Sequence, residues 1–474
     1  MPLILASNSA SGGYNVANSL RFNSGSSDYL SRTPSSTGNR QIFTISCWVK
    51  RSTLTASGKN IMVAWDGAKA SASFGSAIYF NSSDQIEVDH DIAGSDYTFN
   101  TNMVFRDVSA WYHIVLAVDT TQATAANRQT IYVNGSSVTL ATSALGFPIQ
   151  NFNTFFNFSG GENDIGSNYF TAGYADQYMS EFYLIDGQAL TASSFGQTDP
   201  SVPSSGIWIP KAYTGSFGTN GFYQKYANSA ALGTDSSGNG NTFTANNLTS
   251  IDQSTDTPTN NFATLNPIAA QAGSGASSAV NTFTEGNLKV ADLASDTAIA
   301  NFGVSTGKWF WEVQVVTDQD GIAIGACNDG FNLNAELGYN SPASQANGKV
   351  FGYYGSGSKF TTIGDGTQFS AYGSAIAVND IIGVALNLDT NEVTFYKNGS
   401  SQGTFSITTL GSGENYFPAI GNWSAGSVVA NFNFGNPPFT ISSGNADGNG
   451  YGNFEYAVPS GFYALNTKNL ATYG

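Results

Sequence analysis

Charged side chains are scarce in this sequence, where they make up 11% of 474 residues. The charge that is present has mainly one sign, because 33 acidic residues outnumber 17 basic ones and leave a net charge of −16 at pH 7. Such a surface repels the phosphates of nucleic acids and anionic membrane surfaces. The composition therefore disfavours both of these partners and suits polar, neutral ones.

Cysteine and histidine are nearly missing, with two of each in the chain. Their spacing does not suggest a zinc site or a catalytic triad. Cys47 and Cys327 stand in the strand-like runs "ISCWV" and "IGACN", so we expect each to be a small buried side chain. We expect His113, in "WYHIVLAV", to be packed or hydrogen-bonded within a strand.

Long apolar runs are also lacking, and no stretch approaches the length of a transmembrane helix. The start, "MPLILASNSAS", has no basic region, and its apolar run is too short for a signal peptide. We therefore expect a protein that is made in a cytoplasm and that would need another export route to act outside a cell.

Short apolar runs, separated by Gly, Asn, Asp and Ser, recur from end to end. Runs of Ala, Glu, Lys, Leu and Arg at helical spacing are missing. This pattern predicts an all-β protein, and its length predicts more than one domain. We expect two antiparallel β-sandwich domains.

The strand-like runs divide the chain into four parts. Alternating runs such as "IFTISCWVKR" fill residues 1–211, and others such as "KWFWEVQVV" fill residues 281–440. Between them, residues 212–280 are poor in large apolar side chains and rich in turn formers, which predicts an irregular connector. Residues 441–474 are apolar enough to pack on a domain or a neighbour.

One short string occurs twice, as "IYVNGSSV" around Asn134 and as "FYKNGSSQ" around Asn398. Asn-Gly favours the positive φ angles of a tight type I′ turn, so each string predicts a β-hairpin. A chance repeat in an Asn/Gly/Ser-rich chain is the alternative. Similar flanking strands favour a shared architecture in the two halves.

Several blocks carry a family resemblance. "SLRFNSGSSDYLSRTPSS", "FTISCWVKRS", "WYHIVLAVDTT" and "DQYMSEFYLIDGQALTASSF" resemble the laminin-G-like, concanavalin A-like jelly roll over about the first 200 residues. "GKWFWEVQV", "GIAIGACNDG" and "IIGVALNLDTNEVTFYKNGSSQGTFS" resemble a SPRY domain.

The pairing of these two domains, with "YLSRTPSS", "DSSGNGN" and "PSGFYALNTKNL", is similar to a class of tailed-phage virion proteins. This resemblance implies a fibre, spike or decoration at the virion surface that adheres to host surface polysaccharide. It also implies other virion proteins as partners. Because linked weak sites gain by effective concentration, we expect a homo-oligomer, a trimer as in many phage fibres.

The candidate segment for glycoside hydrolysis is "IEVDHDI", where strand spacing places Glu87, Asp89 and Asp91 on one face. Glucanases of the concanavalin A-like fold mount catalytic carboxylates in this way, but their second Glu corresponds here to Ile92. Glycoside hydrolysis needs a pair of correctly placed carboxylates, and one position of the glucanase pattern is apolar here. We therefore expect a protein that is not an enzyme.

Binding remains, and aromatic side chains outside the expected core are the candidate sugar contacts. They are Trp65, Tyr97, Tyr339 and Trp423; each could instead be structural. No cofactor is expected, although laminin-G-like folds sometimes carry calcium, and its candidate ligands here are Asp89, Asp91, Asp119 and Asp164. Two alternatives to adhesion stay open: a passive head or tail decoration protein and a glycan depolymerase that uses Glu87.

Overall fold

The protein was analysed as a computed structural model. It describes residues 13–56, 58–66, 74–92, 95–143, 145–167, 173–201, 203–269, 281–293, 297–317, 321–331, 333, 337–338, 348–363, 366–410, 413–422 and 428–474. The chain forms two compact units, with the boundary between Thr259 and Asn260. We call them the N-terminal unit and the C-terminal unit, and describe each by itself.

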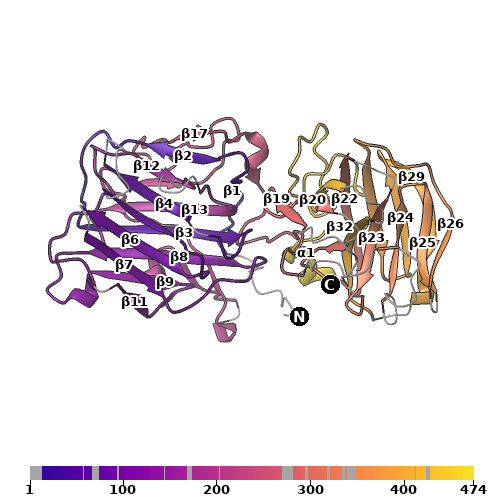
Figure 1. Ribbon diagram of the computed structural model, residues 1–474, viewed down its shortest axis with the longest axis horizontal. Coiled ribbons are helices and arrows are strands. Elements are labelled where there is room, and N and C mark those ends of the chain that lie inside the picture. The colour runs from indigo at the N-terminus through magenta and orange to yellow at the C-terminus, as the bar shows by residue number, and fades with distance from the viewer. Residues whose placement is uncertain are drawn as a thin grey trace. The chain divides into compact units, whose positions relative to one another are not determined.

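The N-terminal unit consists of two main antiparallel sheets (Figure 1). The first sheet contains, in spatial order, β10 (Ser136–Ser137), β9 (Gln129–Val133), β8 (Trp111–Asp119), β3 (Ile42–Arg51), β13 (Gln177–Asp186), β1 (Ser19–Phe22) and β18 (Gln253–Ser254), with β16 (Phe222–Gln224) also paired to β13. The second contains β11 (Leu140–Thr142), β7 (Ser95–Thr101), β6 (Ile86–Ile92), β5 (Phe74–Phe80), β4 (Lys59–Trp65), β12 (Asn163–Ile165), β2 (Tyr29–Arg32) and β17 (Thr244–Asn246). A small additional sheet pairs β14 (Gly196–Thr198) with β15 (Trp208–Pro210).

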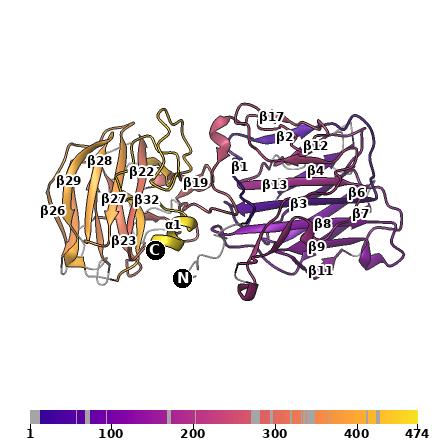
Figure 2. The ribbon, with the colours of Figure 1, turned by 180° about the vertical axis from the view of Figure 1, so that it is seen from behind.

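The C-terminal unit also has two main sheets, which Figure 2 shows from behind. The first contains β19 (Thr282–Thr284), β20 (Lys289–Leu293), β31 (Val428–Asn433), β22 (Lys308–Thr317), β27 (Ile381–Asn387), β28 (Glu392–Lys397) and β29 (Ser400–Ser406), with β32 (Tyr463–Ala464) parallel to β22. The second contains β21 (Thr297–Ile299), β30 (Tyr416–Asn422), β23 (Ile322–Asn328), β24 (Val350–Tyr354), β25 (Ser358–Ile363) and β26 (Gly366–Ala371).

Helical structure is short throughout the described residues. The α-helix is α1 (Thr467–Tyr473), which begins where the Asn466 side chain accepts a hydrogen bond from the Asn469 N–H at 3.0 Å. Single 3-10 turns are η1 (Ala125–Asn127), η2 (Ala192–Ser194), η3 (Pro203–Ser205), η4 (Ser250–Asp252) and η6 (Thr408–Leu410). No helix in the described part of the chain is long and apolar enough to cross a membrane. The predicted all-β class is confirmed.

Each unit has its own core between its two sheets. In the N-terminal unit, alternate residues of β3, from Phe43 to Val49, pack against side chains of the second sheet. In the C-terminal unit, Trp309, Trp311 and Val313 of β22 do the same. Cys47 and Cys327 are buried free thiols, as expected. The two-residue repeat of these strands therefore gives the predicted sandwiches.

The two Asn-Gly strings form matching hairpins. Asn134 and Gly135, between β9 and β10, have φ angles of 45° and 87°. Asn398 and Gly399, between β28 and β29, have 49° and 76°. These positive values are those of the predicted type I′ turn.

The segment expected as a connector divides at the unit boundary. Up to Thr259 it belongs to the N-terminal unit, where it supplies β16, β17 and β18 to the two sheets. Asp256 also accepts a hydrogen bond from the buried Lys50 at 2.8 Å. The segment is held by strand pairing and by this ion pair, although few of its residues are apolar.

The C-terminal segment packs on the C-terminal unit itself. Phe454 contacts Phe310 on the outward face of β22, with 5.2 Å between ring centroids. The buried Glu312, next along β22, accepts hydrogen bonds from the backbone N–H groups of Glu455 and Tyr456, at 3.0 and 2.9 Å. This segment thus covers one outer face of the sheet.

Candidate functional site

A group of polar side chains lies on the outer face of the second sheet of the N-terminal unit. Along β6 the burial alternates, with Val88 and His90 in the interior and Glu87, Asp89 and Asp91 half-buried on the other face. The expectation that these three carboxylates share a face is confirmed. The two-residue side-chain period of a strand is sufficient to place them there.

Strand pairing adds three neighbours that reasoning from the sequence missed. On β5, Tyr79 lies opposite Glu87. On β7, Thr98 and Asp96 lie opposite Asp89 and Asp91. We call these six residues the acidic face: Tyr79, Glu87, Asp89, Asp91, Asp96 and Thr98. Alternation in "SAIYF" could have placed Tyr79 on this face, but the register that brings Asp96 here depends on how β6 pairs with β7.

Hydrogen bonds hold the acidic face in a defined arrangement. The Tyr79 hydroxyl donates to Glu87 Oε1, and Asn81 Nδ2 donates to Glu87 Oε2 at 2.8 Å. Thr98 Oγ1 donates to Asp96 Oδ1 at 2.6 Å. Because these side chains stand on paired strands, they form a rigid set of oxygen acceptors.

Burial and neighbouring carboxyl groups raise the pKa values of two residues of this face, Asp89 and Tyr79. Burial, a hydrogen bond with Asp96 and repulsion by Asp96, Glu87 and Asp91 raise the pKa of Asp89 to about 8. Asp89 is therefore protonated at neutral pH and can donate a hydrogen bond. Burial and the hydrogen bond to Glu87 raise the pKa of Tyr79 far above its usual value, so its hydroxyl keeps its proton. Both protons are engaged within the face, that of Tyr79 by Glu87 and that of Asp89 by Asp96, so the face offers mainly hydrogen-bond acceptors.

The aromatic candidates do not gather at one site. Trp65, expected in a loop, is the last residue of β4 and is 1% exposed, packed with Val63 and Ala77. A ring that is covered in this way cannot offer a face to a sugar, so the prediction for Trp65 is wrong. Tyr339 and Trp423 lie outside the described residues.

Tyr97 lies within β7 and not in a loop. It is half-exposed and contacts Phe152 edge-on, with 5.3 Å between ring centroids. Its β6 partner is the buried His90, so it faces away from the acidic face. Tyr97 stays a candidate contact residue by exposure alone.

The four calcium candidates are not brought together. Asp89 and Asp91 share the acidic face, but β5 and β4 stand between β6 and the strand β12 that carries Asp164. Asp119 ends β8 in the other sheet, where Thr121 Oγ1 and Gln122 Nε2 donate to its carboxylate at 2.6 Å each. One ion cannot span these positions, because calcium–oxygen distances are about 2.3–2.6 Å.

Side-chain clusters elsewhere in the described part of the chain do not offer a metal site either. No group of three or more His, Cys, Asp or Glu side chains among the described residues could hold a metal ion. The calcium prediction, as one site built from those four residues, is therefore wrong.

The histidines serve the fold in the described structure. His113 is buried, with Nε2 3.0 Å from Ser46 Oγ, and its Nδ1 accepts from Trp208 Nε1 at 2.9 Å. Burial lowers the pKa of His113 to about 3, so it is neutral. This matches the expected packed strand position.

Comparisons with known proteins agree with the domain pairing. Residues 24–193 match the concanavalin A-like lectin/glucanases superfamily, and residues 308–437 match the SPRY domain. Ran-binding protein 9 of Xenopus laevis is 33% identical over 138 residues, which are 28% of this chain and 23% of that protein. The ATP-dependent RNA helicase Ddx1 of Drosophila melanogaster is 32% identical over 143 residues, which are 29% of this chain and 17% of that protein.

The matched segment thus spans less than a quarter of these curated relatives. Among solved structures, the SPRY domain of human HERC1 is 15% identical with a TM-score of 0.27, covering 35% of this chain and 96% of that one. A heptameric SAP-like pentraxin from Limulus polyphemus is 16% identical with a TM-score of 0.28, covering 38% and 80%. From its matched segments, the chain combines a concanavalin A-like, laminin-G-like domain with a SPRY domain.

Proposed function

We propose that this is a non-catalytic binding protein that holds a polysaccharide against the acidic face of its N-terminal unit. The observation that carries the proposal is the rigid, half-exposed set of carboxylates, in which Tyr79 holds Glu87 by a hydrogen bond. Sugar hydroxyls donate hydrogen bonds to such acceptors. A concanavalin A-like domain next to a SPRY domain suits a protein built for recognition.

The resemblance to tailed-phage proteins supplies the wider setting of this proposal. We place the protein at a virion surface, after synthesis in the host cytoplasm. Its partners would be host surface polysaccharide and other virion proteins, and it would act as a homo-oligomer, a trimer. The net charge of −16 supports the exclusion of nucleic acid as a partner.

Retention on immobilised host polysaccharide tests the binding site. Glu87→Gln and Asp96→Asn, made singly, are expected to weaken retention by about tenfold, the effect of losing about 1.4 kcal/mol of hydrogen bonding. Glu392→Gln removes the same charge from the C-terminal unit and should leave retention unchanged. If the folded, oligomeric wild-type protein is not retained, adhesion is rejected and a passive decoration role takes its place.

Hydrolysis is a second candidate, which one observation favours. Asp89, whose pKa is raised to about 8, keeps a proton at neutral pH, and strand residues two apart stand about 6.8 Å from each other along the backbone. This spacing of the two residues lies within the range of about 6.5–9.5 Å that separates the carboxyl groups of inverting glycosidases. Unchanged polysaccharide length after prolonged incubation supports binding alone. Shortening by the wild type, lost in both Asp89→Asn and Glu87→Gln, would overturn the non-catalytic proposal.

A further inference from the structure

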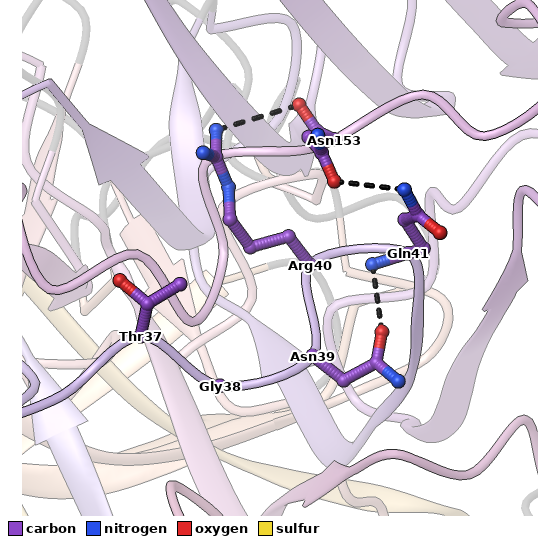
Figure 3. A pocket seen from close by; sticks show the side chains of 6 residues that line it. All are labelled: Thr37, Gly38, Asn39, Arg40, Gln41 and Asn153. Carbon is purple, nitrogen blue, oxygen red and sulfur yellow. Dashed lines mark hydrogen bonds between the residues drawn. The ribbon is translucent and has the colours of Figure 1, made fainter.

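An open polar pocket of about 450 Å³ in the N-terminal unit is lined by residues that do not belong to the acidic face. It is formed where the chain enters β3 and where a second loop passes close by. Its lining residues are Thr37, Gly38, Asn39, Arg40, Gln41 and Asn153. Figure 3 shows the Arg40 and Gln41 side chains both reaching Asn153. The volume falls within the range of about 300–1,000 Å³ that is usual for small-molecule sites.

The Arg40 guanidinium is held in place by its surroundings. Nε donates to the Thr154 carbonyl at 2.5 Å, and Nη2 donates to the Asn153 carbonyl at 3.5 Å. The guanidinium carbon lies 4.5 Å from the centroid of the Phe158 ring and 5.4 Å from that of Phe155. Such stacking restricts the side chain before any ligand arrives.

The pocket has unused donors and one unused acceptor. Asn39 Oδ1 accepts from the N–H groups of Gln41 and Ile42, at 3.0 and 2.8 Å, which leaves its Nδ2 without a partner among the described residues. Asn153 Oδ1 accepts from Gln41 Nε2 at 3.0 Å. In the same described residues, Asn153 Nδ2, Arg40 Nη1 and Gln41 Oε1 have no partner.

Unlike Arg51 and Arg106 of the same unit, Arg40 has no carboxylate beside it among the described residues. Arg51 and Arg106 both pair with Asp84, at 3.1 and 2.9 Å. Arg40 forms no ion pair with any carboxylate in the described part of the chain. Asp186, which contacts this loop, is engaged by the Asn39 N–H at 2.7 Å. Burial lowers the pKa of Arg40, but a guanidinium stays charged at neutral pH.

We propose that this pocket binds a carboxylate carried on a hydroxylated ring, the chemistry of a hexuronic acid residue. Arg40 Nη1 and Asn153 Nδ2 would donate to the two carboxylate oxygens. Gln41 Oε1 would accept from a ring hydroxyl. A planar guanidinium with a neighbouring amide donor matches a planar carboxylate better than it matches a neutral hydroxymethyl group.

This site deepens the proposed function, because it assigns an acidic sugar to the polysaccharide that the protein would hold. A strongly acidic protein repels anions in general. A half-buried guanidinium that has no carboxylate partner among the described residues is the feature that would make such a ligand acceptable.

Glucuronate and glucose are the probes, since they share a ring and differ in the carboxylate. Binding to the full-length protein is measured by calorimetry or ligand-observed NMR. We expect glucuronate to bind at least about tenfold more tightly than glucose, a difference of about 1.4 kcal/mol. Equal affinities for the two sugars would overturn the proposal, as would acetate or inorganic phosphate that binds as tightly as glucuronate.

Asn153→Asp tests the proposed carboxylate site most directly. It keeps the oxygen that accepts from Gln41 but replaces the free amide donor with a negative oxygen beside Arg40. We expect glucuronate binding to fall by at least about tenfold, with unchanged thermal unfolding. Arg40→Lys should also weaken binding, because an ammonium cannot donate as a planar fork.

Lys211→Gln, which removes one exposed positive charge outside the pocket, should have no effect. Unchanged glucuronate binding in Asn153→Asp would overturn the proposal. Polysaccharide retention that depends on Glu87 but not on Arg40 would leave the proposed function intact while rejecting this site.

Discussion

Asp89 carries a charge state that follows from its neighbours and not from its residue type. Alternation along β6 predicts that Glu87, Asp89 and Asp91 share a face, and the structure confirms it. The pairing of β6 with β7 then adds Asp96 to the same face. Burial and repulsion by Asp96, Glu87 and Asp91 disfavour the charged form of Asp89, so this carboxyl group keeps its proton at neutral pH.

The protonated Asp89 predicts a pH dependence of stability. Its pKa is about 8 in the folded protein and 3.8 in its ordinary state. The folded state therefore binds the extra proton, and the stabilisation is complete below about pH 4 and lost as pH rises to 8. We expect the unfolding temperature of the N-terminal unit to fall over this range, by a free energy on the order of 2 kcal/mol after allowance for solvent screening.

Asp89→Asn is the matching variant, because an amide has no proton to lose in this range. It should flatten the dependence between pH 5 and pH 8, with the larger gain in unfolding temperature at pH 8. A variant with the same pH profile as the wild type would show that another group titrates here. Differential scanning calorimetry of the full chain measures both profiles.

Among elements, the two Asn-Gly hairpins do more than reverse the chain. Asn134 Oδ1 accepts from the His113 N–H at 2.8 Å, and Asn398 Oδ1 accepts from the Ile381 N–H at 2.9 Å. In each unit the turn asparagine therefore fixes the start of the strand that pairs with its own hairpin. The repeated string performs the same task twice, which supports a shared architecture over chance.

The glycines of these hairpins are also covered by aromatic rings. A Cβ at Gly135 would lie 2.5 Å from the Trp208 ring, and one at Gly399 would lie 2.6 Å from the Tyr456 ring. Trp208 and Tyr456 both come from segments well after the hairpin in the chain. The Asn-Gly pair by itself favours the turn, whereas the contact with the aromatic ring depends on the tertiary fold.

Substitution at Gly399 separates the two contributions. Gly399→Ala should cost about 2–4 kcal/mol, from a positive φ of 76° and from the collision with Tyr456. Gly450→Ala is the control, since Gly450 has a φ of 79° with open space around it, and should cost about 1–2 kcal/mol. Equal losses in thermal or denaturant unfolding would mean that the ring adds nothing.

At the scale of the whole molecule, the N-terminal unit is longer than its apolar pattern indicates. Residues 212–259 were expected as a connector because their strands are short and turn formers surround them. Their few apolar side chains nevertheless reach the core, where Phe222 and Phe243 lie 4.8 Å apart edge to face. Lys50, 1% exposed, has its carboxylate partner Asp256 in the same segment.

Truncation tests this boundary. A protein of residues 10–259 should fold, whereas one of residues 10–211 should not, because it exposes core side chains and leaves the Lys50 ammonium buried without its partner. Removing one member of a buried ion pair alone costs about 3–5 kcal/mol. Circular dichroism and proteolysis distinguish the two forms. A stable, protease-resistant 10–211 fragment would contradict the boundary at Thr259.

The sequence by itself determined the all-β class, the sandwich cores, the two type I′ hairpins and the shared face of Glu87, Asp89 and Asp91. These depend on residue preferences and on a two-residue period that acts over a few neighbours. Only the tertiary structure decided that Trp65 is buried, that Asp119 and Asp164 stand apart, and that no carboxylate of the described residues pairs with Arg40. Those outcomes depend on which strands and loops, distant in the chain, lie beside one another, and local preferences do not encode that pairing.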